Sequence, residues 1–198
     1  MSRKVTVSKE IILDAALKML IRDGYASVNI KSLAEEIGCS TQPLVWHFEN
    51  MEGLRKALAE YAAEYASKKA FQKKVSAKKQ NAAEIFESLG RAYVKMAMKE
   101  PNLFRFLYLG ESPLGKPYDL KDISRNKDSV LMADEIAGMT GISREGAARC
   151  IRDTVIYSHG IATMIATGVY SAGEKQIMSM IKSASECFLL REGGTLYE

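Results

Sequence analysis

Residues 24–54, GYASVNIKSLAEEIGCSTQPLVWHFENMEGL, decide the fold of this chain of 198 residues. From Ile30 to Ile37 the apolar residues repeat at the helical spacing i, i+3, i+4, i+7. Gly38 follows, a residue that ends a helix in a tight turn, and Ser40 is of a type that caps the next helix. The stretch therefore predicts two short helices joined by a tight turn, which is the helix-turn-helix arrangement.

The second of these helices divides its side chains between two faces. At 100° per residue, Leu44 and Phe48 point inward together, whereas Gln42 and Trp46 point the opposite way. So short a helix, with a glutamine and a tryptophan facing outward, is suited to entering the DNA major groove. The alternative is a small three-helix bundle in which Trp46 and Phe48 are core. Leu44 and Phe48 are core under either interpretation.

Four side chains on or beside this helix have the chemistry to contact DNA. Gln42 can bind an adenine edge through two hydrogen bonds, and Val45 can touch a thymine methyl group. Thr41 can reach a base or a phosphate, and His47 can donate to a phosphate.

The same stretch resembles the DNA-binding segment of tetracycline-repressor-type (TetR/AcrR) transcriptional regulators. The residues that carry the resemblance are Gly24, Tyr25, Ser27, Ile30, Ala34, Gly38, Ser40, Leu44, His47, Phe48, Asn50, Glu52 and Leu54. EPNLFRFLYL at 100–109 and YSHGIATMIATG at 157–168 are similar to segments of that family's variable carboxy-terminal domain. The resemblance implies a homodimeric regulator, more often a repressor, that binds a near-palindromic DNA operator and is released by a small-molecule effector.

Three positions in the stretch depart from the family pattern. Val45 stands where an aromatic residue usually contacts DNA, Met51 replaces a lysine that commonly binds a phosphate, and Glu49 adds a negative charge. We therefore expect Trp46, His47 and the backbone amides at the start of the next helix to supply more of the phosphate binding. The predicted DNA-binding residues are Lys31, Ser40, Thr41, Gln42, Pro43, Val45, Trp46, His47, Asn50 and Met51.

The rest of the chain predicts an all-α protein of about nine helices, because no stretch alternates apolar and polar residues as a half-buried strand does. A first helix begins after Ser8, and later helices are expected at about 122–139, at 143–167 and from Ser171. The expected domains are a three-helix helix-turn-helix domain at 1–54, a connecting helix at 55–80, and a carboxy-terminal helical ligand-binding and dimerisation domain at 81–198.

Within 81–198, the last two predicted helices are apolar over more than one face, so both sides must be covered. The resemblance implies that these helices form a twofold dimer interface, for which the expected residues are Ile151, Val155, Ala162, Ile177, Ile181, Ala184 and Phe188. It also implies a ligand pocket among the helices before them. Inward periodicity suggests Phe86, Tyr93, Met96, Phe104, Tyr108, Met132, Ile136 and His159 as its lining.

Composition narrows the other possibilities. The net charge of +4 comes mainly from 61–80, where six lysines face a single acid, and we interpret this surplus as a solvated connector. Three scattered cysteines and the absence of an apolar run at the start favour a cytoplasmic protein without a membrane span. Only two histidines occur and no metal-binding or nucleophile motif is visible, so we expect no metal site, no cofactor and no enzymatic activity.

Competing interpretations remain open at this point. Residues 136–151 align with the first motif at an offset of 103 and are a weaker second DNA-reading candidate, although a simple helix–helix turn explains them better. GESPLGKP at 110–117 resembles a phosphate-binding loop without its hydroxyl residue. A redox sensor acting through Cys150 or Cys187 is a further alternative. The last is a small-molecule-binding or scaffolding dimer that does not bind specific DNA.

Overall fold

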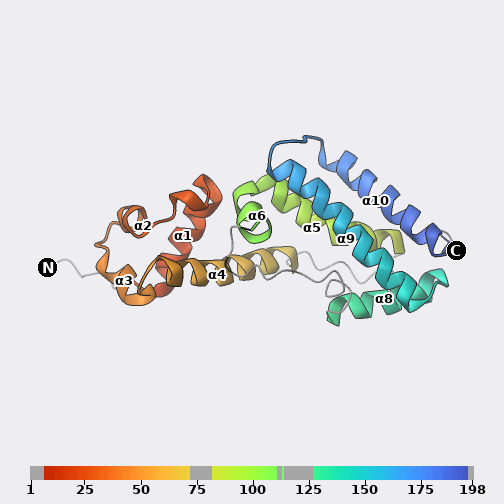
Figure 1. Cartoon of the computed structure of the whole chain (residues 1–198), viewed down its shortest axis with the longest axis horizontal. Coiled ribbons are helices and arrows are strands. Elements are labelled where there is room, and N and C mark those ends of the chain that lie inside the picture. The colour runs from red at the N-terminus through yellow and green to blue at the C-terminus, as the bar shows by residue number, and fades with distance from the viewer. Residues whose placement is uncertain (1–6, 72–81, 111–112, 114–126, 196–198) are drawn as a thin grey trace. The chain divides into compact units, whose positions relative to one another are not determined.

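The computed structural model describes residues 7–71, 82–110, 113 and 127–195, and all regular secondary structure in these ranges is helical. The elements are α1 (Lys9–Asp23), the 3₁₀ helix η1 (Tyr25–Ser27), α2 (Ile30–Ile37), α3 (Gln42–Phe48), α4 (Met51–Phe71), α5 (Ala82–Lys99), α6 (Pro101–Tyr108), α8 (Lys127–Thr140), α9 (Arg144–Ala166) and α10 (Glu174–Arg191) (Figure 1). The all-α fold predicted from the sequence is confirmed.

The helix caps agree with the sequence in part. Ser8 caps α1 by accepting a hydrogen bond from the Ile11 amide, as predicted. The cap of α3 is Thr41 instead of Ser40, and it makes no side-chain hydrogen bond. Ser171 does not cap α10, which begins three residues later after a glycine. Of the helix predicted at 122–139, the first five residues lie outside the described part of the chain.

The chain divides into two compact units. The first comprises residues 1–73 and 100–115, and the second comprises 74–99 and 116–198. The first unit includes α6, which the sequence analysis had placed in the carboxy-terminal domain. The reason is packing: α6 lies against α1 and α4, and Phe106 stacks on Tyr25 with 5.0 Å between ring centroids.

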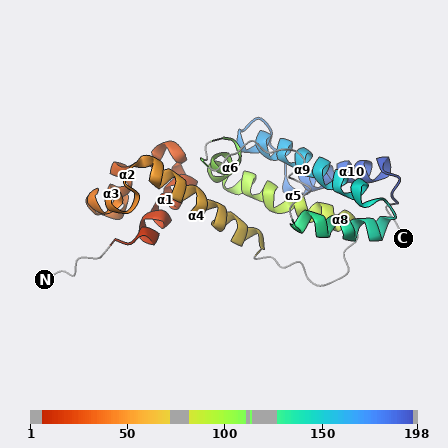
Figure 2. The same ribbon diagram turned by 60° about the horizontal axis from the view of Figure 1, so that its bottom comes forward.

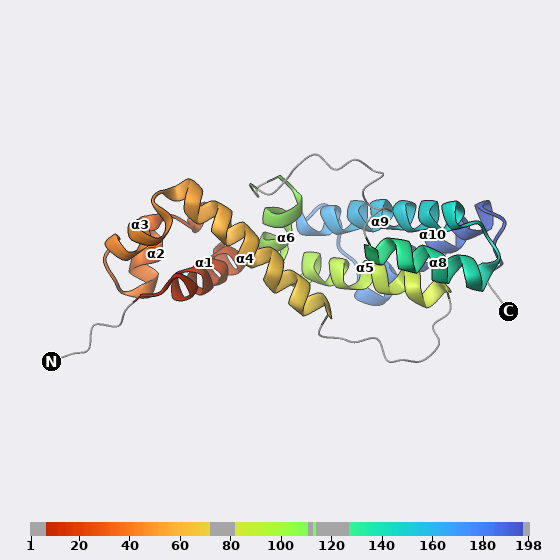
Figure 3. The ribbon, with the colours of Figure 1, turned by 90° about the horizontal axis from the view of Figure 1, so that it is seen from below.

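In the first unit α1 packs against α2, α3, α4 and α6, and the two short helices α2 and α3 lie together at one end (Figure 3). Every α-helix of the unit contributes buried apolar side chains, among them Ile12, Leu20, Leu33, Leu44, Leu58 and Phe104. Asn102 of α6 joins the end of α1, where its side-chain amide donates to the carbonyl oxygen of Ile21 over 3.0 Å. This contact satisfies one of the carbonyl groups that a helix end leaves without a helical partner.

The second unit is a bundle in which α9 packs against α5, α8 and α10, and α5 also packs against α10 (Figure 2). The close packing needs a glycine. A Cβ atom at Gly90 would lie only 3.0 Å from both Ser158 Oγ and Ile181 Cδ1. None of the described helices is long and apolar enough to cross a membrane.

Residues 136–151, the second DNA-reading candidate, form the α8–α9 turn in this unit. Gly141 bends the chain with a φ of 71°, and Ser143 caps α9 by accepting from the Gly146 amide. Ala147 and Cys150 are fully buried in the core of the bundle. The start of α9 is therefore a packed helix rather than an exposed recognition helix. Most of the segment 110–117, which resembles a phosphate-binding loop, lies outside the described residues.

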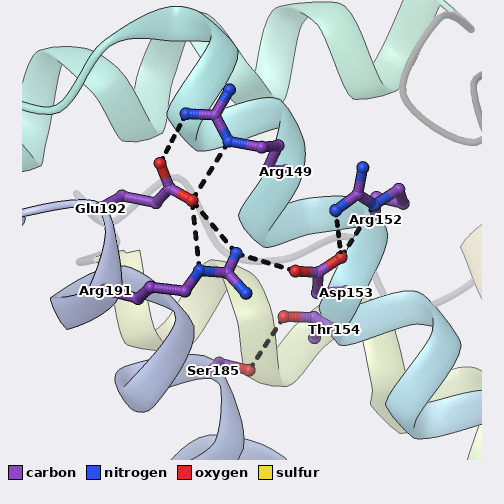
Figure 4. Close-up of polar contacts among 7 residues, drawn as sticks. All are labelled: Arg149, Arg152, Asp153, Thr154, Ser185, Arg191 and Glu192. Carbon is purple, nitrogen blue, oxygen red and sulfur yellow. Dashed lines mark hydrogen bonds and ion pairs between the residues drawn. The ribbon is translucent and has the colours of Figure 1, made fainter.

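Ion pairs hold the end of α10 against α9 (Figure 4). Arg149 binds Glu192 over 2.6 Å, and Arg191 binds Asp153 over 2.8 Å and Glu192 over 3.1 Å. The hydrogen bond from Arg149, followed by that from Arg191, lowers the pKa of Glu192 from an ordinary value near 4.5 to about 2. A depressed carboxylate pKa means that the charged form stabilises the folded chain.

We therefore predict that Glu192→Gln lowers the melting temperature at pH 7. The pKa of Glu192 is lower in the folded than in the unfolded chain. Its contribution is thus complete above about pH 4.5 and is lost as the pH falls toward 2. Calorimetry should show a melting-temperature difference between variant and parent that is largest at pH 7 and shrinks below pH 4.5.

The matched control is Glu135→Gln, which removes an exposed carboxylate from α8 of the same unit. It should change the melting temperature little at either pH. A Glu192→Gln difference that is the same at pH 7 and pH 3.5 would contradict the assignment of the stabilisation to these ion pairs.

Candidate nucleic-acid interface

The two faces of α3 differ as the sequence predicts. Leu44 and Phe48 are buried in the core of the first unit, while the Trp46 side chain is 78% exposed and Val45 is 45% exposed. Gln42 is exposed on the same helix. A large indole kept in solvent on a seven-residue helix contributes nothing to the core of this chain. The interpretation of Trp46 as a core residue is therefore wrong.

The turn before α3 depends on a glycine. Gly38 adopts the left-handed conformation with φ 75° and ψ 36°, which side chains with a Cβ atom seldom adopt. The next amide, of Cys39, donates to the Ala34 carbonyl oxygen over 3.0 Å and closes the end of α2. Leu33 and Ala34 are buried, so the turn is anchored to the core.

The junction after α3 is equally constrained. Glu49 has a φ of 64° and a ψ of −52°, and the Asn50 amide donates to the Phe48 carbonyl oxygen over 2.7 Å. These three residues form a γ-turn, a strained conformation that is rare for residues other than glycine. The turn brings α4 so close that a Cβ atom at Gly53 would overlap the Phe48 carbonyl oxygen. The backbone thus fixes the direction in which α4 continues from α3.

Asn50 caps α4 from inside this junction. Its Oδ1 accepts from the amides of Glu52 and Gly53 over 2.9 and 3.0 Å. The resemblance and the departures at Val45, Met51 and Glu49 predict that the amides at the start of this helix bind phosphate. Two of these amides already have a partner, so that part of the expectation needs correction. The lysine that the family commonly has at this start is replaced by Met51, which is half-buried.

His47 also has a partner within the chain. Its Nε2 lies 3.0 Å from the carbonyl oxygen of Val7, the residue before the cap of α1. Its ring packs edge-on against Trp46 with 4.6 Å between centroids. The sequence offered no signal for this contact, since 40 residues separate the two partners.

The remaining predicted DNA-binding residues occupy the same end of the first unit. Lys31 is exposed on α2, Ser40 and Thr41 are exposed in the turn, and Pro43 is half-buried in the first turn of α3. The structure therefore places a set of polar and aromatic groups around one short exposed helix.

The predicted ligand-pocket residues are divided between the two units. Phe104 and Tyr108 belong to the first unit, and the other six belong to the second. Phe86 and Ile136 are fully buried in the bundle core, whereas Met96 and Met132 are half-buried. Two surface hollows lie elsewhere, one of about 270 Å³ beside Arg105 and one of about 600 Å³ beside Arg91. None of the described residues that line them is a predicted pocket residue.

Two predicted pocket residues, Tyr93 on α5 and His159 on α9, do meet inside the second unit. The Tyr93 hydroxyl lies 2.5 Å from His159 Nδ1, and both side chains are half-buried. Burial lowers the pKa of His159, because a charged imidazolium is poorly solvated there. A neutral ring can accept a hydrogen bond from the tyrosine hydroxyl at Nδ1, so the two side chains form a polar pair.

The predicted dimer residues lie mostly inside one chain. Ile151, Ala162, Ile177 and Ile181 are at most 1% exposed because α9 and α10 bury them against each other and against α5. Val155, Ala184 and Phe188 are half-buried. Four of the seven side chains therefore have no surface left for a partner. The exposed apolar residues of α9 lie on another stripe, at Ile156 and Met164, with Gly160 between them.

The two candidate redox cysteines differ in exposure. Cys150 is buried, and burial raises the pKa of its thiol to about 11, so it remains protonated and unreactive at neutral pH. Cys187 is exposed. Among the described residues, no group of three His, Cys, Asp or Glu side chains could hold a metal ion.

Comparison with known proteins places this geometry in a family. Residues 12–58 match the sequence model described as "Bacterial regulatory proteins, tetR family". No curated protein sequence matches the chain.

Solved structures with the same fold extend over both units. TetR from Acinetobacter baumannii AYE is 15% identical, with a TM-score of 0.64 over 93% of this chain and 98% of that one. A TetR variant from the same strain, in complex with minocycline, is 16% identical, with a TM-score of 0.59 over 93% and 98%. A TetR-like transcriptional regulator from Rhodococcus sp. RHA1 is 11% identical, with a TM-score of 0.59 over 96% and 98%.

The matched range contains α2, α3 and the turn between them, which are the elements that present Gln42 and Trp46. The helix-turn-helix domain of this chain, within residues 12–58, is thus a domain of the kind found in the tetR family of bacterial regulatory proteins.

Proposed function

We propose that this protein is a ligand-responsive transcriptional repressor that binds a near-palindromic DNA operator as a homodimer. The observation that carries the proposal is the exposed face of α3, where Trp46 is 78% exposed beside the exposed Gln42. The match of residues 12–58 to the tetR family model supports DNA as the partner.

On this proposal α3 lies in the major groove. Gln42 pairs with an adenine edge, Val45 touches a thymine methyl, and Trp46 covers apolar base or sugar surface. Thr41, Ser40 and Lys31 border the helix and reach the phosphates. The rigid junctions at Gly38 and Glu49 support this role, because a reading helix must enter the groove in one orientation.

The dimer forms through the outer sides of α9 and α10. The four side chains buried within one chain cannot contribute, so the interface uses Ile156, Gly160 and Met164 of α9, with the half-buried Val155 at its edge. Cys187 and Leu190 of α10 are exposed and extend the surface. Twofold symmetry then sets two α3 helices against half-sites about one helical turn, or a multiple of it, apart.

The effector binds in the second unit. The minocycline complex of the related TetR variant is consistent with a small-molecule ligand, and the Tyr93–His159 pair supplies a polar site that can orient one. Of the other predicted lining residues in this unit, Phe86 and Ile136 are apolar core in the described structure. Ligand binding releases the DNA by favouring a conformer whose two α3 helices no longer span both half-sites.

A second function is favoured by the departures from the family pattern between α3 and the start of α4. Val45, Met51 and Glu49 weaken the expected DNA contacts, and Asn50 occupies two of the helix amides. A small-molecule-binding or scaffolding dimer without specific DNA binding is the alternative. A gel-shift experiment with genomic fragments separates the two, since only the repressor selects particular fragments.

We predict that the double substitution Gln42→Ala and Trp46→Ala abolishes selective DNA binding, because it removes the exposed face of α3. The thermal unfolding of this variant should remain close to that of the parent, since neither side chain is buried. Gel shifts and calorimetry measure the two effects. Leu44→Ala is the control on the opposite face and should cost about 2–5 kcal/mol of stability. A large loss of stability in the double variant would mean that α3 is structural.

We predict that Gly160→Arg converts the dimer into a monomer without unfolding the chain. A Cβ atom at Gly160 meets no atom within 4 Å in one chain, so the arginine is tolerated by the fold but not by an apolar interface. Light scattering gives the mass, and circular dichroism gives the helix content. Gly138→Arg on α8, where a Cβ atom also meets nothing, is the matched control and should remain dimeric. A dimeric Gly160→Arg protein would exclude this interface.

A further inference from the structure

We propose that the groove between α5 and α10 is an anion site that takes the phosphate groups of a small molecule. The groove has a volume of about 600 Å³ and is lined by Arg91 of α5 and by Glu174, Lys175, Met178, Ser179 and Lys182 of α10. Known small-molecule sites have volumes of about 300–1,000 Å³. The inference is independent of the proposed function, because none of these residues belongs to α3, to the Tyr93–His159 pair or to the proposed dimer surface.

The two walls of the groove are held together by the packing beneath it. A Cβ atom at Gly90 of α5 would lie only 3.0 Å from Ile181 Cδ1 of α10, so the two helices approach each other closely. Met178 and Ile181 are buried in one apolar cluster with Val94 of α5. The groove therefore has a packed apolar floor, and its shape exists before a ligand binds.

One carboxylate in the groove faces two cations. Glu174 is the only acidic side chain among the described lining residues. Its Oε1 lies 3.5 Å from Arg91 Nη1 and 3.1 Å from Lys95 Nζ, and both cations come from α5. A carboxylate carries a single negative charge, so this cluster of three side chains keeps one positive charge in excess.

Two lysines of α10 add to the excess. Lys175 and Lys182 are seven residues apart, which is about two helical turns, so they lie on the same side of the helix. Within the described ranges Lys175 forms no ion pair. Lys182 reaches Glu186 only over 3.8 Å, which is longer than the usual 2.7–2.9 Å of a charge-assisted hydrogen bond. Both lysines are exposed, so a ligand in the groove can reach them.

The donors in the groove favour phosphate over a lone carboxylate as the ligand group. A phosphate group presents three acceptor oxygens and close to two negative charges, whereas a carboxylate presents two oxygens and one charge. The exposed Ser179 supplies a hydroxyl donor between the two lysine ammonium groups. The Arg91 guanidinium can bind a phosphate through two parallel hydrogen bonds.

Glu174 is the internal competitor of such a ligand. Its contact with Arg91 is long, and its side chain is 36% exposed, so the carboxylate holds the two α5 cations loosely. A bound phosphate takes over these cations and repels the carboxylate. Removal of the Glu174 charge is therefore expected to strengthen phosphate binding, while removal of the lysines weakens it.

The test is a calorimetric titration of the full chain with inorganic pyrophosphate at constant ionic strength, with chloride as the balancing anion. We expect the parent to bind pyrophosphate and Lys175→Ala with Lys182→Ala to bind it about tenfold more weakly. Glu174→Gln should bind it more tightly, by up to about fivefold. Circular dichroism checks that each variant keeps the parent's helix content.

The matched charge control is Lys18→Ala with Lys68→Ala, which removes two exposed cations from α1 and α4 of the first unit. It lowers the net charge by the same amount and should bind pyrophosphate like the parent. A loss of affinity in this control equal to that of the α10 lysine variant would mean that the whole chain attracts the anion, and would overturn the site.

A second probe, adenosine diphosphate, separates an inorganic from an organic source of the phosphate groups. Tighter binding than that of pyrophosphate assigns the groove to an organic phosphate whose body occupies the remaining volume, and weaker binding assigns it to inorganic phosphates. Failure of the parent to bind either probe overturns the inference. Weaker pyrophosphate binding by Glu174→Gln than by the parent also contradicts it, because the carboxylate would then support the anion instead of competing with it.

Discussion

The rest of the first unit depends on the burial of two side chains, Leu44 and Phe48, on one face of α3. A seven-residue helix is too short to persist by itself in water, so tertiary packing must hold it. Burying two such side chains stabilises the folded chain by about 3–6 kcal/mol. This stabilisation also compensates for leaving the apolar indole of Trp46 exposed to solvent. The same packing that forms the helix thus determines which side chains it leaves free.

The backbone on either side of α3 converts this burial into a fixed orientation. Gly38 before the helix and Glu49 after it both have positive φ values, and Gly53 gives the first turn of α4 room beside the Phe48 carbonyl. His47 adds a connection to Val7. Each junction allows few backbone conformations, so α3 is held rigidly. A protein that reads base edges requires such rigidity.

Sequence periodicity predicted the two faces of α3, the turn at Gly38 and the all-helical fold, because these features depend on neighbours three or four residues away. It missed the place of α6 in the first unit and the partner of His47, which depend on contacts between residues far apart in the chain. In α9 and α10 periodicity found the apolar stripes but could not say what covers them. Ile177 and Ile181 are covered by the same chain, not by a second one.

The central claim is that the exposed face of α3 reads DNA as part of a twofold dimer. Selection of bound sequences from a random DNA pool by the full-length parent protein tests it most directly. The account predicts enrichment of an inverted repeat whose half-sites are separated by about one helical turn, roughly 10 base pairs, or a multiple of it. Failure to enrich any sequence, or enrichment of a single site without twofold symmetry, would contradict it.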